Sequence, residues 1–264
     1  MIGKKGQLTG DGGTGERPTA RASAYGPLKA AMDWVAALLL LLGLAPFLAC
    51  VAVAVALTSP GPIIYSQTRL GKAGSHFRIW KFRTMVHGCE SGTGPVWSIA
   101  NDPRTTCIGR FLRRTHIDEL PQLWNVLRGE MSLIGPRPER PEIAAKIEQV
   151  LPEFRDRLEV RPGLSGLAQV LIPPDADIHT VRRKLTHDVE YIRCFGLVLD
   201  VRIALATVLC LAGFPPVIAG WLVRDAARVT TPKSSPVQEL PPMTISAFSA
   251  GHVAPITIQE SMAA

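Results

Sequence analysis

Hydrophobic and polar positions divide the chain into two long apolar runs with a mixed segment between them. The first run, residues 34–57, is uncharged and rich in Leu, Ala and Val. The second run, residues 196–223, is interrupted by Asp200 and Arg202 and later by two adjacent prolines. Residues 62–193 alternate between apolar and polar positions, as folded domains do. The pattern predicts a globular segment between two membrane-associated elements.

The first run is long enough to cross a bilayer as one helix, since it would extend about 36 Å against a hydrocarbon core of roughly 30 Å. Pro46 lies near its middle and removes a helical hydrogen bond, so a kink is expected. Lys29 precedes the run and Arg69 and Lys72 follow it. Because basic flanks prefer the cytoplasm, both ends favour the same side. Two interpretations stay open: a re-entrant helix over residues 27–60, broken at Pro46, and a kinked helix that spans the membrane.

The second run is harder to interpret. Its uncharged part, residues 203–222, is just long enough to span a membrane. The charges of Asp200 and Arg202 give its first turns a polar face, which is typical of a helix lying in the interface. The sequence predicts a membrane-associated helix and leaves both arrangements open.

The two ends of the chain and its middle differ in pattern. Residues 1–26 and 225–264 are polar and Pro-rich, without apolar periodicity, and are predicted to be disordered tails. Short alternation predicts two strands in the middle segment, joined by the turn at residues 71–74. Helical spacing predicts three helices. The strands are expected at residues 63–65 and 77–82, and the helices at residues 117–127, 141–151 and 181–192.

The formal net charge of +7 comes from one stretch of the chain. Residues 69–114 hold nine basic side chains against two acidic ones, an excess equal to that of the whole chain. A basic surface beside a membrane segment would meet anionic headgroups or phosphorylated ligands. Nucleic acid is not expected as a partner, because no aromatic-interleaved stacking motif or DNA-binding signature accompanies the charge. The five cysteines form no C-x-x-C pair, which argues against a disulfide framework or a zinc site.

Two neighbouring carboxylates, Asp118 and Glu119, are the main candidates for chemistry. Pro121 lacks an N–H and fits best in the first turn of a helix, which places both acids at the helix N-terminus. The free N–H groups there stabilise negative charge, so an ionised carboxylate is available as a nucleophile or a Mg²⁺ ligand. The arginine pair that begins at Arg113 suits phosphate oxygens. A structural interpretation stays open, because Thr115 and Asp118 also match a capping box.

Other basic side chains are candidate ligands for an anionic substrate. Arg137 and Arg161 stand in the proline-containing turns G-P-R-P and R-P-G. Lys81 and Arg83 alternate with aromatic residues as on a half-buried strand, and a solvated strand face explains them equally well. His116 is a further candidate for a general base, but a lone histidine near a helix start is more often incidental.

Several motifs occur together in an order that is typical of one family. They are Lys81-Phe-Arg-Thr-Met85, Asp118-Glu-Leu-Pro-Gln-Leu123, Trp124-Asn-Val-Leu127, Gly129-Glu-Met-Ser132, Gly135-Pro-Arg-Pro138, Val160-Arg-Pro-Gly163 and, after Gly166, Ala168-Gln-Val170. With these motifs and the preceding apolar run, residues 28–214 resemble the bacterial sugar transferases, also called polyprenyl-phosphate hexose-1-phosphate transferases or monotopic phosphoglycosyl transferases.

The resemblance implies a fold and a place in the cell. The fold class would be α/β and predominantly helical, with a small cytosolic catalytic domain over residues 61–224 that includes a C-terminal membrane-associated helix. A re-entrant helix broken at Pro46 and interfacial helices would seat this domain on the cytoplasmic face of the bacterial inner membrane. The product would start the synthesis of a cell-surface polysaccharide or glycoconjugate.

The resemblance also implies a reaction and its residues. A nucleotide diphosphate sugar, usually UDP-linked, would give its sugar 1-phosphate to polyprenyl (undecaprenyl) phosphate. Asp118 would be the covalent nucleophile and Glu119 its partner, with Mg²⁺ near both carboxylates. Arg113 matches a position linked to phosphate binding, and Arg137 matches one linked to the nucleotide. Lys81, Arg83 and Arg161 are further expected substrate contacts.

The chain departs from the family pattern at a few positions. Ala45 precedes Pro46 where the family often has serine, and Leu167 stands where an aromatic residue is common. The chain resembles the compact form of the family, without an N-terminal bundle of spanning helices. Two other classes of protein are alternatives to the sugar transferase. A non-enzymatic membrane adaptor would not need the acid pair beside a Pro-Arg-Pro turn. A transferase with many membrane spans would need more apolar runs than this sequence has. The identity of the sugar and the oligomeric state stay open.

Overall fold

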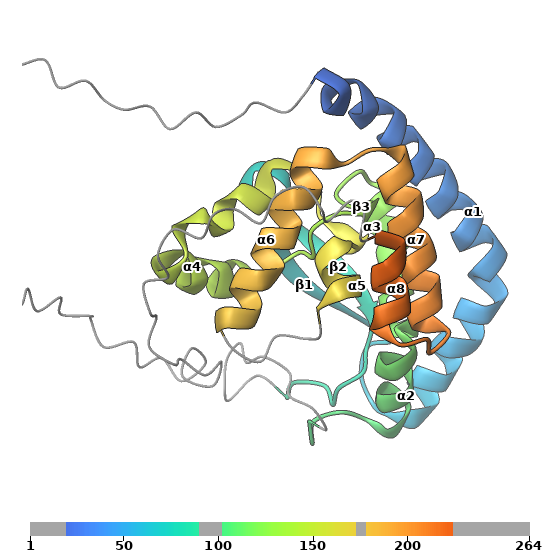
Figure 1. Ribbon diagram of the computed structural model, residues 1–264. Coiled ribbons are helices and arrows are strands. Elements are labelled where there is room, and N and C mark those ends of the chain that lie inside the picture. Colours follow the sequence, from blue (N-terminus) through green and yellow to red (C-terminus); the bar gives the residue numbers. More distant parts are fainter. Residues whose placement is uncertain (1–19, 90–101, 173–177, 224–264) are drawn as a thin grey trace, which may run out of the picture.

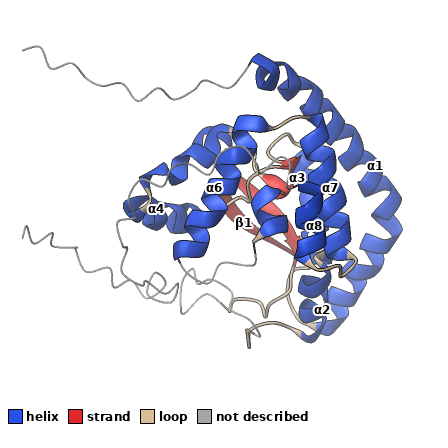
Figure 2. Ribbon diagram, viewed as in Figure 1, coloured by secondary structure: helices blue, strands red, loops and turns tan. Residues whose placement is uncertain are grey.

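The computed structural model describes residues 20–89, 102–172 and 178–223. Figures 1 and 2 show helices surrounding a small centre of short strands. This arrangement confirms the predominantly helical α/β class that was predicted. In chain order the elements are α1 (Ala20–Thr58), β1 (Ile64–Leu70), η1 (Lys72–Gly74), β2 (His76–Phe82), α2 (Cys107–Thr115), η2 (Ile117–Gln122), α3 (Leu123–Leu127), β3 (Ser132–Ile134), α4 (Pro141–Val150), η3 (Pro152–Glu159), β4 (Gly163–Ser165), α5 (Leu167–Leu171), α6 (Ile178–Cys194), α7 (Leu197–Leu211) and α8 (Pro216–Val223).

Helix α1 is continuous through both of its internal prolines, Pro27 and Pro46, so the break predicted at Pro46 does not interrupt it. At 1.5 Å per residue it is about 58 Å long, and Figure 1 shows it bowed around the outside of the domain. Pro46 is exposed, and curvature of the helix accommodates its missing hydrogen bond and its ring. The bow lets one face of the helix follow the curved surface of the domain.

The two faces of α1 have different surroundings. Positions on the inner face recur every three or four residues, and the buried ones are Asp33, Ala37, Val51 and Val55. The outer face is also apolar but exposed, with Trp34, Leu39, Leu42, Phe47 and Val53. One helix among the described residues is long and apolar enough to cross a membrane, the Tyr25–Thr58 part of α1, and an 18-residue window within it has a mean hydropathy of 2.8.

Strands β1 and β2 form an antiparallel hairpin, as the alternation predicted, with η1 in the turn. Phe77 and Ile79 of β2 are buried against α1 and α3. Asn125 of α3 is fully buried and extends the edge of β2 with its side chain, since its amide donates to the carbonyl oxygen of Arg78 at 2.7 Å and accepts from the Trp80 N–H at 3.2 Å. The hairpin therefore fixes the position of the η2–α3 segment.

Strands β3 and β4 form a short parallel pair that no pattern in the sequence predicted. Ser132 lies opposite Gly163, and Ile134 lies opposite Ser165. The backbones are packed so closely that a Cβ atom on Gly163 would fall on the backbone nitrogen of Gly135. Because the strands are parallel, the segments 135–138 and 166–169 leave the sheet at the same edge.

The remaining helices make two further apolar clusters. Helix α4, η3 and α6 share one cluster around Ile147 and Leu185. Helices α5 to α8 share the other with β3, around Tyr191 and Ile203. The second apolar run is divided into α7 and α8 by residues 212–215, so the alternative of one spanning helix over residues 203–222 is wrong. The prolines that start α8 account for the division, because proline cannot continue a helix.

The first helix begins earlier in the chain than the sequence predicted. Helix α1 begins at Ala20, inside the range 1–26 that was predicted to be a tail. Residues 1–19 and the predicted C-terminal tail, 225–264, lie outside the described residues. The predicted helices at residues 141–151 and 181–192 correspond to α4 and α6.

Candidate active site

Asp118 and Glu119 lie in the first turn of η2, which follows α2 after a single residue. That residue, His116, has the left-handed conformation with φ of 56°, and it turns the chain sharply. Pro121 is the fifth residue of η2 and so lies beyond the first turn in which it was predicted, although both acids do lie in that turn. The capping-box interpretation is wrong, because the Thr115 hydroxyl donates to the carbonyl oxygen of Phe111 at 2.9 Å inside α2. The two acids are therefore held by the turn itself rather than by a cap.

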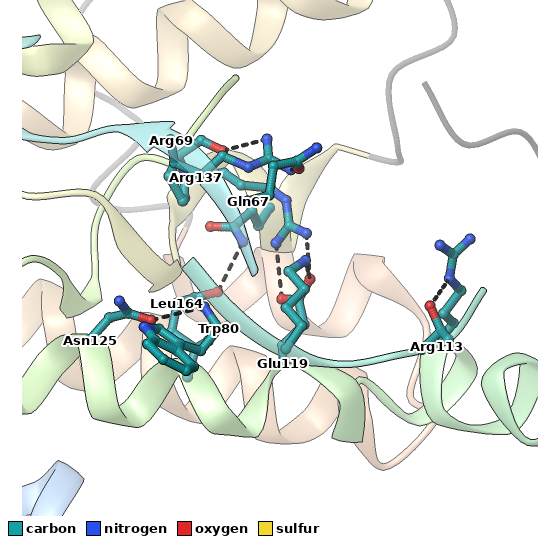
Figure 3. Close-up of polar contacts among 12 residues, drawn as sticks. Gln67, Arg69, Trp80, Arg113, Glu119, Asn125, Arg137 and Leu164 are labelled. Atoms are coloured by element: carbon teal, nitrogen blue, oxygen red, sulfur yellow. Dashed lines mark hydrogen bonds and ion pairs between the residues drawn. The ribbon is translucent and has the colours of Figure 1, made fainter. Parts of the chain in front are cut away.

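Glu119 is bound by two cations from distant parts of the chain. Lys81 of β2 donates from Nζ to Oε1 at 2.7 Å. The Arg137 guanidinium reaches both oxygens, with 2.5 Å from Nη2 to Oε1 and 3.1 Å from Nη1 to Oε2. Figure 3 shows the Arg137 side chain pointing onto Glu119. The structure thus brings together three residues that were predicted to belong to the site.

The charges of these groups explain their protonation. Burial raises the pKa of Glu119, but Arg137 and Lys81 outweigh that effect and hold its pKa well below the usual value. Burial lowers the pKa of Lys81, and Glu119 partly restores it. The Glu119 charge raises the pKa of Arg137 further. Glu119 is consequently a firmly ionised carboxylate within a fixed pair of cations.

Asp118 has different surroundings from its neighbour. It is 7% exposed, yet no side chain or N–H of the described residues donates a hydrogen bond to its carboxylate. Burial raises its pKa, and the charge of Lys81 opposes the shift without cancelling it. A carboxylate with a raised pKa is more basic than one held by cations. The two neighbouring acids therefore have different electrostatic surroundings, and the predicted role of Asp118 as nucleophile stays a prediction.

The loop that carries Arg137 is held from both sides. Arg69 of β1 donates to the carbonyl oxygen of Pro138 at 3.3 Å and pairs with Glu139 at 3.2 Å. Arg157 donates to the carbonyl oxygen of Arg137 at 2.8 Å and pairs with the buried Asp188 at the same distance. The Arg137 side chain itself stays 45% exposed. A fixed backbone with an open guanidinium suits the binding of a phosphate from solution.

The other predicted ligands lie outside this cluster. Arg113 of α2 donates to the Thr84 hydroxyl at 2.8 Å, and Figure 3 shows it set apart from the Glu119–Arg137 pair, although its charge lowers the pKa of Asp118. Arg83 is buried and donates to the carbonyl oxygens of Ser59 and Pro60, both at 2.6 Å. Arg161 is exposed and lies beside Gly129. A substrate role for these three arginines stays a prediction.

Sequence reasoning missed the residues that support the site. Arg69 was considered only as part of the basic stretch and as a basic flank of the first apolar run, and Arg157, Asp188 and Glu139 were not considered. Their contacts join residues that are far apart in the chain. No local spacing signals such contacts, and only the R-P-G and G-P-R-P turns indicated that a rigid loop was present.

The carboxylates also bear on the Mg²⁺ prediction. Among the described residues, no group of three or more His, Cys, Asp or Glu side chains converges as a ligand set. A carboxylate offers about four lone-pair sites, and Lys81 and Arg137 occupy both on Oε1 and one on Oε2 of Glu119. One lone-pair site on Oε2 of Glu119 and the Asp118 carboxylate remain as possible metal ligands. That set fits Mg²⁺ completed by substrate phosphates and water, which is how this ion is commonly bound.

Comparison with known proteins shows the family of the chain. Residues 24–213 match the family described as Bacterial sugar transferase, and the chain belongs to that family. It is 42% identical over 184 residues to the UDP-N-acetylgalactosamine-undecaprenyl-phosphate N-acetylgalactosaminephosphotransferase of Aeromonas hydrophila, a match that covers 70% of this chain and 43% of that protein. It is 42% identical over 186 residues to the exopolysaccharide production protein PSS of Rhizobium leguminosarum bv. phaseoli, covering 69% and 93%.

A third relative is the UDP-glucose:undecaprenyl-phosphate glucose-1-phosphate transferase of Escherichia coli, 41% identical over 183 residues, covering 69% of this chain and 39% of that protein. The chain thus spans less than half the length of the Aeromonas and Escherichia relatives and nearly all of the Rhizobium protein. The family match over residues 24–213 includes the whole candidate site.

Proposed function

We propose that this protein transfers a sugar 1-phosphate from a UDP-sugar to undecaprenyl phosphate and thereby starts the synthesis of a surface polysaccharide. The named substrates of its relatives support the two substrate classes. The observation that carries the mechanism is the contrast between the carboxylates: Glu119 is held by two cations, and Asp118 is buried beside them without a hydrogen-bond donor.

In the proposed reaction, an Asp118 oxygen attacks the phosphorus that bears the sugar. The bond from that phosphorus to the bridging oxygen breaks, and UMP leaves with the electron pair. The acyl phosphate that forms on Asp118 is then attacked by an oxygen of undecaprenyl phosphate. This second step releases the Asp118 carboxylate and gives undecaprenyl diphosphate sugar. Arg137 and Lys81 face the negative charge of the diphosphate, which is the electrostatic contribution that phosphoryl transfer needs.

We propose Mg²⁺ as the cofactor, held by Asp118 and the remaining lone pair of Glu119. When bound, it would neutralise the charge of the diphosphate. The protein residues have separate tasks: Glu119 fixes Lys81 and Arg137 in one place, and the supported loop keeps the Arg137 guanidinium oriented. Arg113 contributes positive charge near the attacking carboxylate.

We also propose that α1 is re-entrant, with the domain on the cytoplasmic face of the inner membrane. Both ends of α1 are bonded to the same domain. Near its start, Lys29 pairs with Asp200 of α7 at 2.7 Å, and just past its end, Ser59 and Pro60 accept hydrogen bonds from Arg83. A helix that crossed the bilayer would have to leave its domain at one end. The exposed apolar outer face is the surface that would meet lipid.

The test is the release of UMP by purified protein given UDP-sugars, Mg²⁺ and undecaprenyl phosphate. We expect release with at least one common UDP-sugar, loss of release on addition of EDTA, and a fall of at least about a thousandfold for Asp118→Asn, because the nucleophile is removed. A radiolabelled sugar should remain on the wild-type protein when the lipid is omitted. Full activity of Asp118→Asn would contradict the mechanism, and absence of UMP release with every UDP-sugar would favour a non-enzymatic membrane adaptor.

A further inference from the structure

Asp33 is a carboxylate on the inner face of the apolar helix α1 that the proposed mechanism does not use. Its Oδ2 accepts a hydrogen bond from the hydroxyl of Ser132 in β3 at 2.6 Å, and both residues are buried. Burying a carboxylate is costly unless it is paired and hydrogen-bonded. The contact between Asp33 and Ser132 therefore matters to both elements, and it joins α1 to the strand that leads into the Arg137 loop.

The Ser132 hydroxyl lies where the chain prepares to leave β3. Its Oγ accepts from the Ile134 N–H at 3.3 Å and lies 2.8 Å from the Ile134 carbonyl oxygen. The hydroxyl carries one hydrogen, which the charged Asp33 attracts more strongly than a carbonyl does, so a lone pair faces the Ile134 N–H. Arg137 follows three residues after Ile134. Asp33 thus orients the hydroxyl that fixes the backbone just before the catalytic loop.

The surroundings of Asp33 differ from those of Asp200, the other buried carboxylate nearby. Lys29 lies 2.7 Å from Oδ2 of Asp200 and 3.5 Å from Oδ2 of Asp33. The Tyr25 hydroxyl also donates to Asp200, at 2.8 Å. Asp200 therefore takes the shorter contacts with the start of α1, whereas the shortest contact of Asp33 is with Ser132. The two acids can be tested separately, because only one of them bonds to the Ser132 hydroxyl.

We propose that Asp33 is a positioning residue of the transferase: by holding the Ser132 hydroxyl it fixes the exit of β3, and through that backbone it keeps Arg137 aimed at the reacting phosphates. Its effect on turnover rests on the proposed function. Arg69 and Arg157 hold the loop at and beyond Arg137, whereas Asp33 acts on the side that precedes it. Helix α1 thereby supplies one of the supports of the active site.

The test measures kcat and KM for UMP release by purified Asp33→Ala, Asp33→Asn and Ser132→Ala. We expect Asp33→Ala to lower kcat at least about tenfold and to change KM by less than about threefold, because the aim of a cation counts most where charge develops in the transition state. Asp33→Asn should keep kcat within about threefold of wild type, since its amide oxygen still accepts from Ser132. Adding Asp33→Ala to Ser132→Ala should lower kcat by no more than about twofold further, because both remove one contact.

Tyr25→Phe is the matched control, because it removes a hydroxyl that bonds Asp200 at the same junction and does not reach Ser132. It should keep the wild-type kcat. A lowered melting temperature in Asp33→Ala with an unchanged kcat would show that Asp33 only docks α1, and would overturn the proposal. An equal loss of kcat in Tyr25→Phe would overturn it too. If Asp33→Ala does not fold, Ser132→Ala decides, and a full kcat in that variant would contradict the role.

A measurement without substrate separates this inference from the proposed function. Amide hydrogen exchange of the peptide that covers residues 132–137 reports how firmly the backbone before Arg137 is held. We expect exchange at least about tenfold faster in Asp33→Ala than in wild type, and wild-type exchange in Asp33→Asn and Tyr25→Phe. The comparison holds even if wild type turns over no UDP-sugar. Unchanged exchange in Asp33→Ala would overturn the inference by itself.

Discussion

The neighbouring side chains of Asp118 and Glu119 share a turn, but their surroundings shift their pKa values in opposite directions. Glu119 gains more from Lys81 and Arg137 than it loses by burial, whereas Asp118 is buried without a donor of its own. At neutral pH the Glu119 charge therefore stabilises the folded protein, and the Asp118 charge destabilises it. A buried charge that destabilises the fold is common at reactive residues, because activity and stability place opposite demands on them.

Substitutions at the two positions should change stability in opposite directions. We expect Glu119→Gln to lower the unfolding free energy by about 2 kcal/mol, since the largely buried Lys81 loses its counter-charge while the half-exposed Arg137 is partly screened by solvent. Asp118→Asn should raise the melting temperature while abolishing turnover, because a buried charge is removed. Thermal unfolding in detergent, followed by circular dichroism, measures both effects. Glu142→Gln is the control, as Glu142 is exposed and should change stability by less than about 0.5 kcal/mol.

The pH dependence of these effects provides an independent check. The folded pKa of Glu119 is depressed, so its contribution is present above its unfolded pKa of about 4.3 and is lost as the pH falls through the folded pKa. The folded pKa of Asp118 is raised, so its protonated form favours folding, and that contribution is lost as the pH rises through the folded pKa. The difference in unfolding free energy between wild type and Glu119→Gln should therefore become smaller as the pH falls below about 4. A difference in unfolding free energy that stayed constant with pH would show that the ion pairs of Glu119 with Lys81 and Arg137 contribute nothing to stability.

At the scale of the element, the parallel pair of β3 and β4 controls the position of the catalytic loop. The strands have three residues each, and their separation depends on glycine at position 163. Gly163 does not need a left-handed conformation. It is required because backbone atoms of Gly135 and Ser165 occupy the space of a side chain.

Gly163→Ala should therefore push β4 away from the segment that leads to Arg137. Overpacking of this kind costs about 1–3 kcal/mol, and a shift of about 1 Å in the loop lowers turnover by roughly a hundredfold. UMP release and thermal unfolding measure the two effects. Gly26→Ala in α1 is the control, because its Cβ would meet no atom within 4 Å and alanine favours a helix. Unchanged turnover in Gly163→Ala would mean that the strand pair does not position Arg137.

The elements show which parts of the structure were accessible from sequence. The hairpin, α4, α6 and the helical segment after residue 117 follow from spacing within one segment, and they were predicted. The β3–β4 pair joins residues about thirty positions apart through strands too short to show a period. Lys81 and Arg83 were predicted as a pair on one strand face, but β2 ends at Phe82, so the alternation stops and Arg83 turns to the end of α1 instead.

At the scale of the whole molecule, exposed apolar surface is concentrated on a few helices. Besides the outer face of α1, helices α7 and α8 expose Val198, Val208, Val217 and Trp221. These two helices pack against each other. A buried polar group joins α7 to the start of α1 and to α6: Asp200 of α7 accepts hydrogen bonds from Tyr25 and Lys29 of α1 and from Tyr191 of α6. The charges are directed inward, and the apolar side chains are left on the surface that lipid would cover.

This arrangement makes the side of the membrane testable in the intact protein. In a background without its native cysteines, Leu28→Cys and Lys72→Cys place single thiols at exposed positions near the start of α1 and beyond its end. Both should react with a membrane-impermeant maleimide in inverted inner-membrane vesicles and neither in intact spheroplasts, because both ends of α1 are bonded to one domain. Cys50, restored alone, is exposed on the outer face and should react only after detergent is added. Labelling of the first two positions from opposite sides would establish a spanning helix and would require the Lys29–Asp200 or the Arg83–Ser59 contact to be absent in the membrane.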